Sequence, residues 1–333
     1  MKRVRIIQLV FFLTLFSCVI LKKKVFDLTK VPPHFPKMEF EENNKFTKAR
    51  WGLGKKIFFD PVLSLDSTIS CASCHKQEFA FADNRAFSPG IKNRAGKRNA
   101  PSLANIGYHP YFLREGGVPT LEMQVLVPIQ EHNEFNHNIV DIGNQLKKNP
   151  EYVKMAKTAY NREPDYWVIT RALGVFERTL ISGNSKYDKY LLEKLKLSAK
   201  EEEGRKLFFS SKTNCSSCHS GFDFTNYSFS NTGLYLNYKD IGRLRFTKDS
   251  SDMAKFKVPS LRNIEVTAPY MHDGSLETLE EVIEHFNSGG KNHVNKSEIL
   301  KPLHLSDEEK GNLILFLKTL TDYEFIDNKV FRK

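Results

Sequence analysis

Two copies of one five-residue motif hold most of the reactive side chains of this sequence. The pattern Cys-x-x-Cys-His attaches a c-type haem, because the two thiols can reach its vinyl groups while the His offers a nitrogen to the iron. A four-Cys zinc site or a redox disulfide would give no reason for a His after each Cys pair. We therefore predict two covalently bound haem c groups. Cys71 and Cys74 would attach the first haem and His75 would ligate its iron, and Cys215, Cys218 and His219 would do the same for the second.

The N-terminus has the pattern of an export signal. Lys2, Arg3 and Arg5 precede an apolar run of 16 residues at 6–21, shorter than the roughly 20 residues that span a bilayer. Leu15-Phe16-Ser17-Cys18 resembles a lipobox. We expect residues 1–17 to be a lipoprotein-type signal peptide and Cys18 to carry the lipid, with a plain signal peptide or a short uncleaved anchor as alternatives.

Residues 18–45, which include three consecutive lysines and a Pro-Pro pair, are expected to form a tether with little that could pack. The expected location is the periplasm, with the protein attached to a membrane only through its N-terminal lipid. This location agrees with haem c, which is attached outside the cytoplasm.

The composition is that of a soluble globular protein of two ordinary domains, with 333 residues and 40% hydrophobic residues. Lysine and arginine outnumber aspartate and glutamate by 50 to 39, which gives a net charge of +11. No nucleic-acid-binding motif accompanies this charge. It indicates either a solvated basic surface or one that docks an acidic electron donor.

The two halves repeat more than the haem motif, which predicts one haem-binding unit used twice. We predict a mostly α fold with two cytochrome c-like haem domains related by internal duplication, a first domain at 46–185 and a second at 186–333. The paired segments are 54–59 with 204–209, 101–106 with 259–264, 110–112 with 269–271, and 120–122 with 278–280.

Helical periodicity and capping patterns support this fold class. Apolar residues between Val168 and Leu180 fall on one helical face. Ser198, Thr278 and Ser306 each precede a Glu by three residues, the pattern of a capping box that opens a helix. We place the boundary between the units near 182–197, where Gly183-Asn184-Ser185 breaks the helical pattern.

The halves differ where each chain segment could face its haem. The first half carries Gln124, Glu131, His132, Glu134 and His137. In the corresponding stretch of the second half, Leu279, Val282, Ile283 and Phe286 form an apolar helical face. This contrast indicates proton chemistry at the first haem and electron transfer at the second.

These motifs together resemble the bacterial dihaem cytochrome c peroxidases and their MauG branch, from about Lys45 to Asp322. The resemblance implies that the first haem is the peroxidatic one, that Glu134 is the catalytic acid and base, and that Gln124 is its partner. From the residues alone, Glu134 could equally be a solvated surface acid. The matching segments are 53–55, 58–61, both haem motifs, 98–102, 128–130 with Glu134, 261–263 and 268–274.

A calcium ion between the units is also implied by the resemblance. Its ligands would be the Asn99 side chain and the main-chain oxygens of Thr267 and Pro269, oxygen ligands of the kind calcium prefers. The alternative is a turn that Asn99 holds without a metal. His272 is expected to be a hydrogen-bonding group near a haem and not a ligand.

Three positions depart from the family pattern. Ile91 falls where resting peroxidases have a His that caps the first haem, so we expect the first iron to need no prior reduction. Phe286 falls where the second haem has a Met or Tyr ligand, which leaves Met271 as the candidate sixth ligand, since His285 would point about 100° away around its helix. Arg114 falls where the family has a tryptophan between the haems.

The function implied is the reduction of hydrogen peroxide to water, with electrons from a small cytochrome c or a cupredoxin. Two alternatives stay open at this stage. One is a MauG-like oxidase that modifies side chains of a partner protein, and the other is a non-catalytic dihaem electron carrier. The family is commonly dimeric, so a homodimer is expected.

Overall fold

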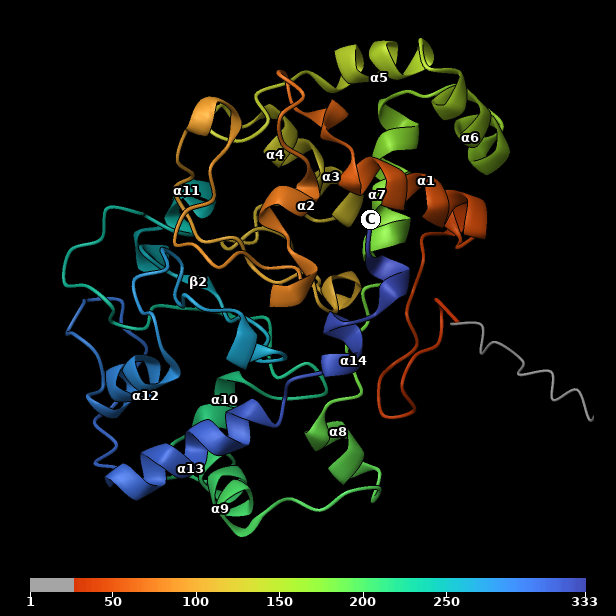
Figure 1. Ribbon diagram of the computed structural model, residues 1–333. Coiled ribbons are helices and arrows are strands. Elements are labelled where there is room, and N and C mark those ends of the chain that lie inside the picture. The colour runs from red at the N-terminus through yellow and green to blue at the C-terminus, as the bar shows by residue number, and fades with distance from the viewer. Residues whose placement is uncertain (1–26) are drawn as a thin grey trace, which may run out of the picture.

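The computed structural model describes residues 27–333 and is mostly helical, as predicted. The expected signal peptide at 1–17 and the lipidation site Cys18 lie outside the described residues. Helices α1 to α7 gather at the top of the view in Figure 1, and α8, α9, α10, α12 and α13 lie at the bottom. The only paired strands of the described chain, β1 (Phe229–Ser230) and β2 (Phe256–Lys257), form an antiparallel pair.

The α-helices of this part of the chain follow in order. They are α1 (Lys48–Phe59), α2 (Cys71–Cys74), α3 (Leu121–Gln124), α4 (Leu126–Gln130), α5 (Ile139–Lys147), α6 (Pro150–Tyr160), α7 (Tyr166–Glu177), α8 (Lys186–Leu191), α9 (Ala199–Phe208), α10 (Cys215–Cys218), α11 (Leu244–Thr247), α12 (Leu279–Asn287), α13 (Asp307–Lys318) and α14 (Tyr323–Ile326). Short 3₁₀ turns connect many of them: η1 (Glu42–Asn44), η2 (Pro61–Leu63), η3 (Gln77–Phe79), η4 (Ile91–Asn93), η5 (Ile106–Tyr108), η6 (Ser250–Asp252), η7 (Ile264–Val266) and η8 (Lys329–Phe331).

The predicted helix starts are confirmed. Ser198, Thr278 and Ser306 are the N-caps of α9, α12 and α13, and each forms a reciprocal capping box with the Glu three residues later. These bonds satisfy amide groups that the first turn of a helix otherwise leaves without partners. The sequence alone therefore located three helix ends correctly.

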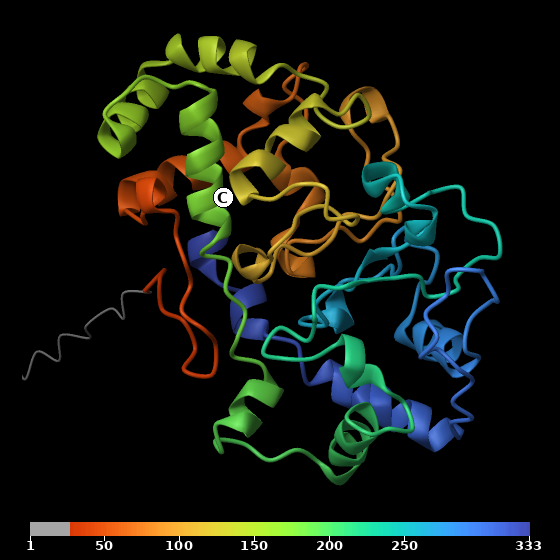
Figure 2. The same cartoon turned by 180° about the vertical axis from the view of Figure 1, so that it is seen from behind.

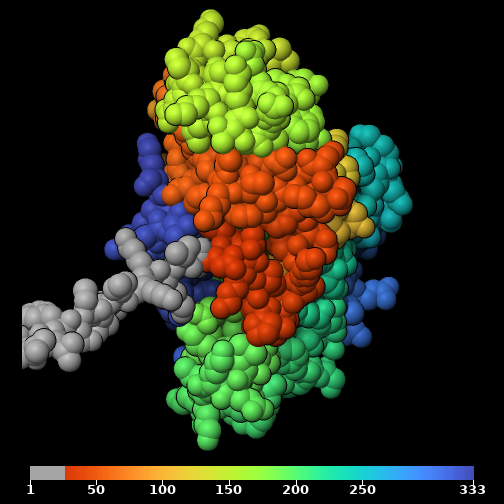
Figure 3. All heavy atoms as spheres, turned by 90° about the vertical axis from the view of Figure 1, so that its right-hand side faces the viewer, coloured from red at the N-terminus to blue at the C-terminus, as the bar shows by residue number. Residues whose placement is uncertain are grey.

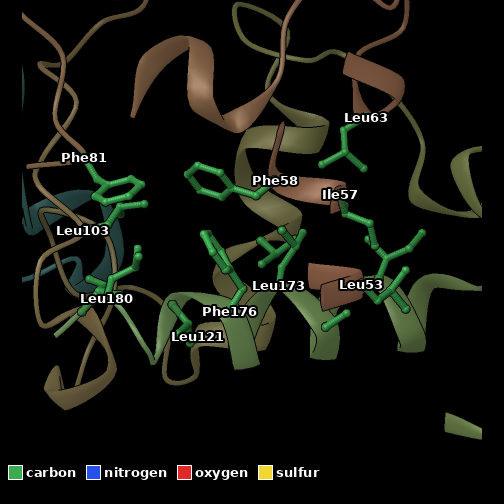
Figure 4. Packing of buried hydrophobic residues seen from close by; sticks show 14 of the residues in the cluster. Leu53, Ile57, Phe58, Leu63, Phe81, Leu103, Leu121, Leu173, Phe176 and Leu180 are labelled. Atoms are coloured by element: carbon green, nitrogen blue, oxygen red, sulfur yellow. The ribbon is translucent and has the colours of Figure 1, made fainter. Parts of the chain in front are cut away.

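The first core forms where α1 crosses α7. Gly54 makes the crossing close, since a Cβ built on it would lie 1.9 Å from the Ala172 carbonyl oxygen. On either side of this contact, apolar side chains of both helices interleave, as Figure 4 shows for Phe58 and Phe176. The centroids of these two rings lie 5.0 Å apart.

The second core repeats this arrangement with α9 and α13. A Cβ on Gly204 would lie 1.9 Å from the Asn312 carbonyl oxygen. Phe208 and Phe316 pack with ring centroids 5.2 Å apart. The glycine of each repeated motif thus has the same physical task, which is to let two helix backbones touch.

Two buried asparagines hold equivalent segments of the two units through the same pair of hydrogen bonds. Asn105 and Asn263 both have a left-handed backbone with φ of 61°. The main-chain N–H of Asn105 donates to the Leu180 carbonyl, and the side-chain Oδ1 of Asn105 accepts from the main-chain N–H of Ser182. The Asn263 amide and Oδ1 make the equivalent bonds to Leu320 and Asp322. The two sets of hydrogen bonds are in contact, since Asn263 Nδ2 donates to Ser182 Oγ at 3.0 Å.

The backbone also corrects one register of the sequence comparison. Leu113 and Met271 have matching positive φ values of 65° and 74°, and both precede glycines of positive φ by three residues. The bridges Phe112–Val118 and Tyr270–Leu276 keep the same offset. Met271 is therefore equivalent to Leu113, whereas the sequence comparison placed it opposite Phe112.

The C-terminal segment returns to the first unit. Phe325 and Phe331 belong to the first core and contact Phe81, while Gln77 Nε2 donates to the carbonyls of Phe325 and Asn328. Figure 2 shows this blue segment beside the green α7. The predicted division at 185/186 therefore assigns the chain end to the wrong core, since its aromatic side chains bury their surface in the first unit.

The segment expected to be a loose tether packs from its middle onward. Phe35, Met38 and Asn44 are buried, and His34 Nε2 bonds Asp188 Oδ1 at 2.7 Å. In Figure 3 the red N-terminal part of the described chain lies along the body and reaches the green lower unit. The expectation failed because it counted charges and prolines and overlooked the apolar residues among them. Nowhere in 27–333 is a helix long and apolar enough to cross a membrane.

The helix crossing in the first core yields a stability prediction. Replacing Gly54 by Ala forces a methyl group into the Ala172 carbonyl, so we expect the free energy of unfolding to fall by about 1–3 kcal/mol. Gly52→Ala on the same helix is the matched control, because nothing lies within 4 Å of its added Cβ. Urea unfolding followed by circular dichroism measures both, and equal effects of the two substitutions would contradict the close crossing.

Candidate functional site

Both Cys-x-x-Cys-His motifs form one turn of helix with the His at its C-terminal end. The first occupies α2 and the second α10, and all four thiols are free of disulfides. His75 Nδ1 lies 2.8 Å from the Phe81 carbonyl oxygen, and His219 Nδ1 lies 3.1 Å from that of Phe224. Because a carbonyl can only accept, Nδ1 carries the proton and Nε2 keeps its lone pair for a metal.

Burial keeps these two imidazoles neutral. It lowers the pKa of His75, and it lowers the pKa of His219 to about 4. A neutral ring is the form that ligates iron. The paired thiols and the oriented His thus fit a covalently attached haem in each unit.

The first motif opens onto a cavity of about 350 Å³. Its lining brings together Cys71, Cys74, His75, Gln124 and Glu134 from α2, α3 and the loop after α4. Cys215, Cys218 and His219 lie outside this cavity, in the second unit. The space beside α2 has the thiols, the ligand and the polar groups that a reactive haem needs, so the residues fit the group predicted from sequence.

Glu134 reaches the cavity from a loop that another loop holds in place. The Ile91 amide donates to the Glu134 carbonyl at 3.0 Å. Gly90 permits this approach, since a Cβ there would lie 1.9 Å from the Asn133 carbonyl oxygen. Burial, with a smaller contribution from Glu131, raises the pKa of Glu134 to about 7. A carboxyl with that pKa can both give and take a proton near neutral pH.

Ile91 itself is 1% exposed and serves as packing under the Glu134 loop. It has no atom that can ligate iron. Gln124 ends α3, and its side chain borders the same cavity. The structure therefore brings both predicted catalytic residues to the first haem motif.

Glu177 is an acid of this cavity that sequence analysis missed. It is the last residue of α7 and is buried, and its Oε2 has no hydrogen-bond partner. Burial raises the pKa of Glu177 to about 8, so this carboxyl is mostly neutral at pH 7. Its neighbour Arg178 pairs instead with Glu122. The sequence does carry a signal for a buried acid here, because Glu177 lies among apolar residues of one helix. The apolar pattern at 168–180 led only to the prediction of the helix itself.

The same cavity has a group of basic side chains. Arg114 and His109 come from the first unit, and Lys257 and Arg245 come from the second. Lys257 Nζ donates to the Tyr111 carbonyl at 2.7 Å and lies 3.0 Å from His109 Nδ1. The cavity thus extends to the junction of the two units.

Asn99 does not fit the calcium ion that the resemblance implies. Its Nδ2 donates to the Arg85 carbonyl, and its Oδ1 accepts from Arg114 Nη2 at 2.8 Å. Arg114 Nε and Nη2 also donate to the Asn99 carbonyl, at 3.1 and 2.8 Å. A guanidinium on the oxygen that should bind the metal repels a second cation. Of the expected ligands Asn99, Thr267 and Pro269, Asn99 is therefore unsuited to a metal, because Arg114 occupies its one side-chain oxygen.

Two histidines of the second unit have partners that do not suit an iron ligand. His285 Nε2 lies 3.1 Å from the Thr232 carbonyl oxygen, which engages the nitrogen a metal would need. The His272 ring stacks on Phe256 with centroids 4.1 Å apart, and its main-chain oxygen accepts from the Asn99 amide. Neither arrangement is that of an iron ligand. Met271 stays a prediction as the sixth ligand.

Comparison with known proteins identifies similar chains of comparable length. The family model described as "Di-haem cytochrome c peroxidase" matches residues 48–196. A methylamine utilization protein MauG of Methylorubrum extorquens is 34% identical over 282 residues, 83% of this chain and 79% of the relative. A cytochrome c551 peroxidase of Nitrosomonas europaea is 35% identical over 277 residues, 81% of this chain and 79% of the relative.

A solved structure described as a MauG-like protein associated with microbial copper homeostasis superposes with a TM-score of 0.87. It is 33% identical, and the match covers 91% of this chain and 97% of that one. A dihaem peroxidase from Burkholderia thailandensis, 21% identical with a TM-score of 0.73, shares the fold.

The unpaired acid in the cavity yields a pH prediction. The pKa of Glu177 is about 8 in the folded chain and near 4.5 ordinarily. The contribution of neutral Glu177 to the free energy of unfolding is therefore complete below pH 4.5 and is lost as pH rises to about 8. The variant Glu177→Gln cannot ionise, so we expect its stability to equal that of wild type at low pH and to exceed it above about pH 8.

Urea unfolding at a series of pH values measures this difference. Glu163→Gln, at an exposed position, is the control and should track wild type throughout. A Glu177→Gln difference that stays constant with pH would show that this carboxyl does not change its charge state on unfolding.

Proposed function

The chain belongs to the dihaem cytochrome c peroxidase family, which includes the MauG proteins, and on that premise we propose that it reduces hydrogen peroxide to water. The observation that carries the proposal is the cavity of the first unit, where Glu134 faces the same space as the first haem motif. When bound, the two haems supply the iron that receives electrons and passes them to peroxide.

The residues around the cavity have distinct tasks in this proposal. His75 would hold the first iron, with its Nδ1–H fixed on the Phe81 carbonyl. Glu134 takes the proton from one oxygen of peroxide and returns it to the other, which leaves as water. The remaining oxygen becomes a second water when it has received two electrons from the donor protein and two protons from solvent. Gln124 orients the peroxide by hydrogen bonding. The near-neutral pKa of Glu134 supports both halves of the proton transfer.

The second unit receives electrons in this proposal. His219 holds its iron, and Met271 is the candidate sixth ligand, since His285 is engaged elsewhere. A small cytochrome c or a cupredoxin is the proposed donor, and the excess of lysine and arginine over aspartate and glutamate, which persists without residues 1–17, favours an acidic one. The equivalent hydrogen bonds of Asn105 and Asn263, and the equivalent helix contacts at Gly54 and Gly204, support descent of both units from one duplicated unit.

We extend the proposal to location and assembly. The N-terminal pattern of a basic segment, an apolar run and Cys18 supports export to the periplasm with a lipid anchor. A homodimer is proposed from the resemblance alone. The calcium ion is not carried into this proposal, because Arg114 occupies the Asn99 oxygen.

A second candidate function is oxidation of side chains on a partner protein. Ile91 favours it, because an uncapped first iron is available without prior reduction. The relative named MauG and the solved structure of a MauG-like protein point the same way. Turnover distinguishes the two: a peroxidase consumes peroxide with small reduced cytochromes, whereas the partner-modifying enzyme turns over poorly with them.

Replacing Glu134 tests the proposed proton transfer. We expect Glu134→Gln to lower kcat/KM for peroxide by about 10²- to 10⁴-fold, because an amide cannot accept the proton. Its haem content and absorption spectrum should stay those of wild type. Glu163→Gln, exposed on a loop, is the control for loss of one acidic group. If Glu134→Gln kept wild-type kinetics, another group would have to carry the proton.

The buried Ile91 yields a second kinetic prediction. The fully oxidised protein should react with peroxide in a stopped-flow experiment at the same rate with or without prior one-electron reduction, since no side chain must leave the first iron. Ile91→Leu is a packing control. A reaction that begins only after reduction would mean that some other residue caps the iron.

A further inference from the structure

Two cations of the first haem cavity have only neutral partners. Arg114 donates to the carbonyl and the side-chain oxygen of Asn99. Lys257 contacts the Tyr111 carbonyl and the His109 ring. Within residues 27–333, neither has a carboxylate within 4.0 Å, although neighbouring Arg98 pairs with both Asp240 and Glu115.

Such cations are costly to bury unless an anion compensates them. Charged groups inside proteins are normally paired or bound to a ligand of opposite charge, because the loss of hydration exceeds what neutral partners return. Burial, with a smaller contribution from Arg114, lowers the pKa of Lys257 to about 8, and burial lowers that of Arg114 to about 10. The acids near each group, such as Asp240 for Arg114 and Asp223 for Lys257, raise the pKa but do not offset the effect of burial.

The cavity itself indicates which anion is missing. It is lined by Cys71, Cys74 and His75 as well as by both cations. A haem attached to these thiols carries two carboxylate side chains, and guanidinium and ammonium groups are the natural partners of carboxylates. No other anion is needed to explain the site.

The two cations come from different units and are directly linked. Arg114 follows η5 in the first unit, and Lys257 is the last residue of β2 in the second. The Lys257 amide donates to the Arg114 carbonyl at 2.6 Å. A ligand that binds both side chains would therefore also fasten the two units at their junction.

We propose that Arg114 and Lys257 bind the carboxylates of the first haem, and that they supply at this junction the positive charge that a calcium ion would otherwise supply. Arg114 does so while bonded to the Asn99 side-chain oxygen that the metal would have used. The proposal rests on haem attachment at Cys71 and Cys74 and is independent of peroxidase turnover.

Redox titration of the purified holoprotein tests the carboxylate contacts. Removing a cation near a haem disfavours addition of an electron, so Lys257→Met and Arg114→Met should each lower the midpoint potential of the first haem. Lys255→Met, two residues from Lys257 and paired with Asp252 at 3.3 Å, is the matched control and should leave the potential unchanged. Unchanged potentials in both cavity variants would overturn the proposal, whatever the peroxidase activity.

Metal analysis tests the replacement of calcium. Wild-type protein should contain far less than one calcium per chain, and a calcium chelator should change neither its melting temperature nor its absorption spectrum. If the protein contained nearly one calcium per chain and lost melting temperature when that calcium was removed, the proposed replacement of calcium would be overturned. If Arg114→Met does not accumulate with haem, Arg114→Lys retains the charge, and the wild-type and Lys257→Met measurements decide the matter.

Discussion

The hydrogen bond between each haem-motif histidine and a backbone carbonyl is the constraint around which both units are arranged. It assigns the proton to Nδ1 and leaves Nε2 to the metal, and it requires the chain after each motif to turn back and present its oxygen. Phe81 and Phe224, which offer these oxygens, are themselves core residues. The packing of each core therefore sets the direction in which its iron ligand points.

The two units share this frame and differ in what they place around it. Glycine at a helix crossing, a left-handed asparagine and a one-turn haem helix recur in both. Around the first motif, acids and bases line one cavity, whereas α12 of the second unit buries Leu279 and Ile283. A similar scaffold with different linings is what the proposed function requires, in which one haem reacts and the other passes electrons.

Sequence reasoning succeeded where a local pattern determines local geometry. The haem motifs and the capping boxes were found because spacing along a helix or a turn suffices to predict them, whereas Glu134 was singled out by the family resemblance. It failed where distant segments meet. The Arg114 contact with Asn99 depends on the tertiary fold, and no short-range pattern predicts it. Glu177 and Phe35 each had a local signal, an acid in an apolar helical face and apolar residues in a charged segment, but only the tertiary fold shows that they are buried.

The return of residues 323–333 to the first core ties the integrity of that core to a segment that follows the second core in sequence. Phe325 and Phe331 close the aromatic cluster around Phe81, and Phe81 offers the carbonyl that orients His75. Residues 48–196 alone would therefore lack part of the packing that fixes the first iron ligand.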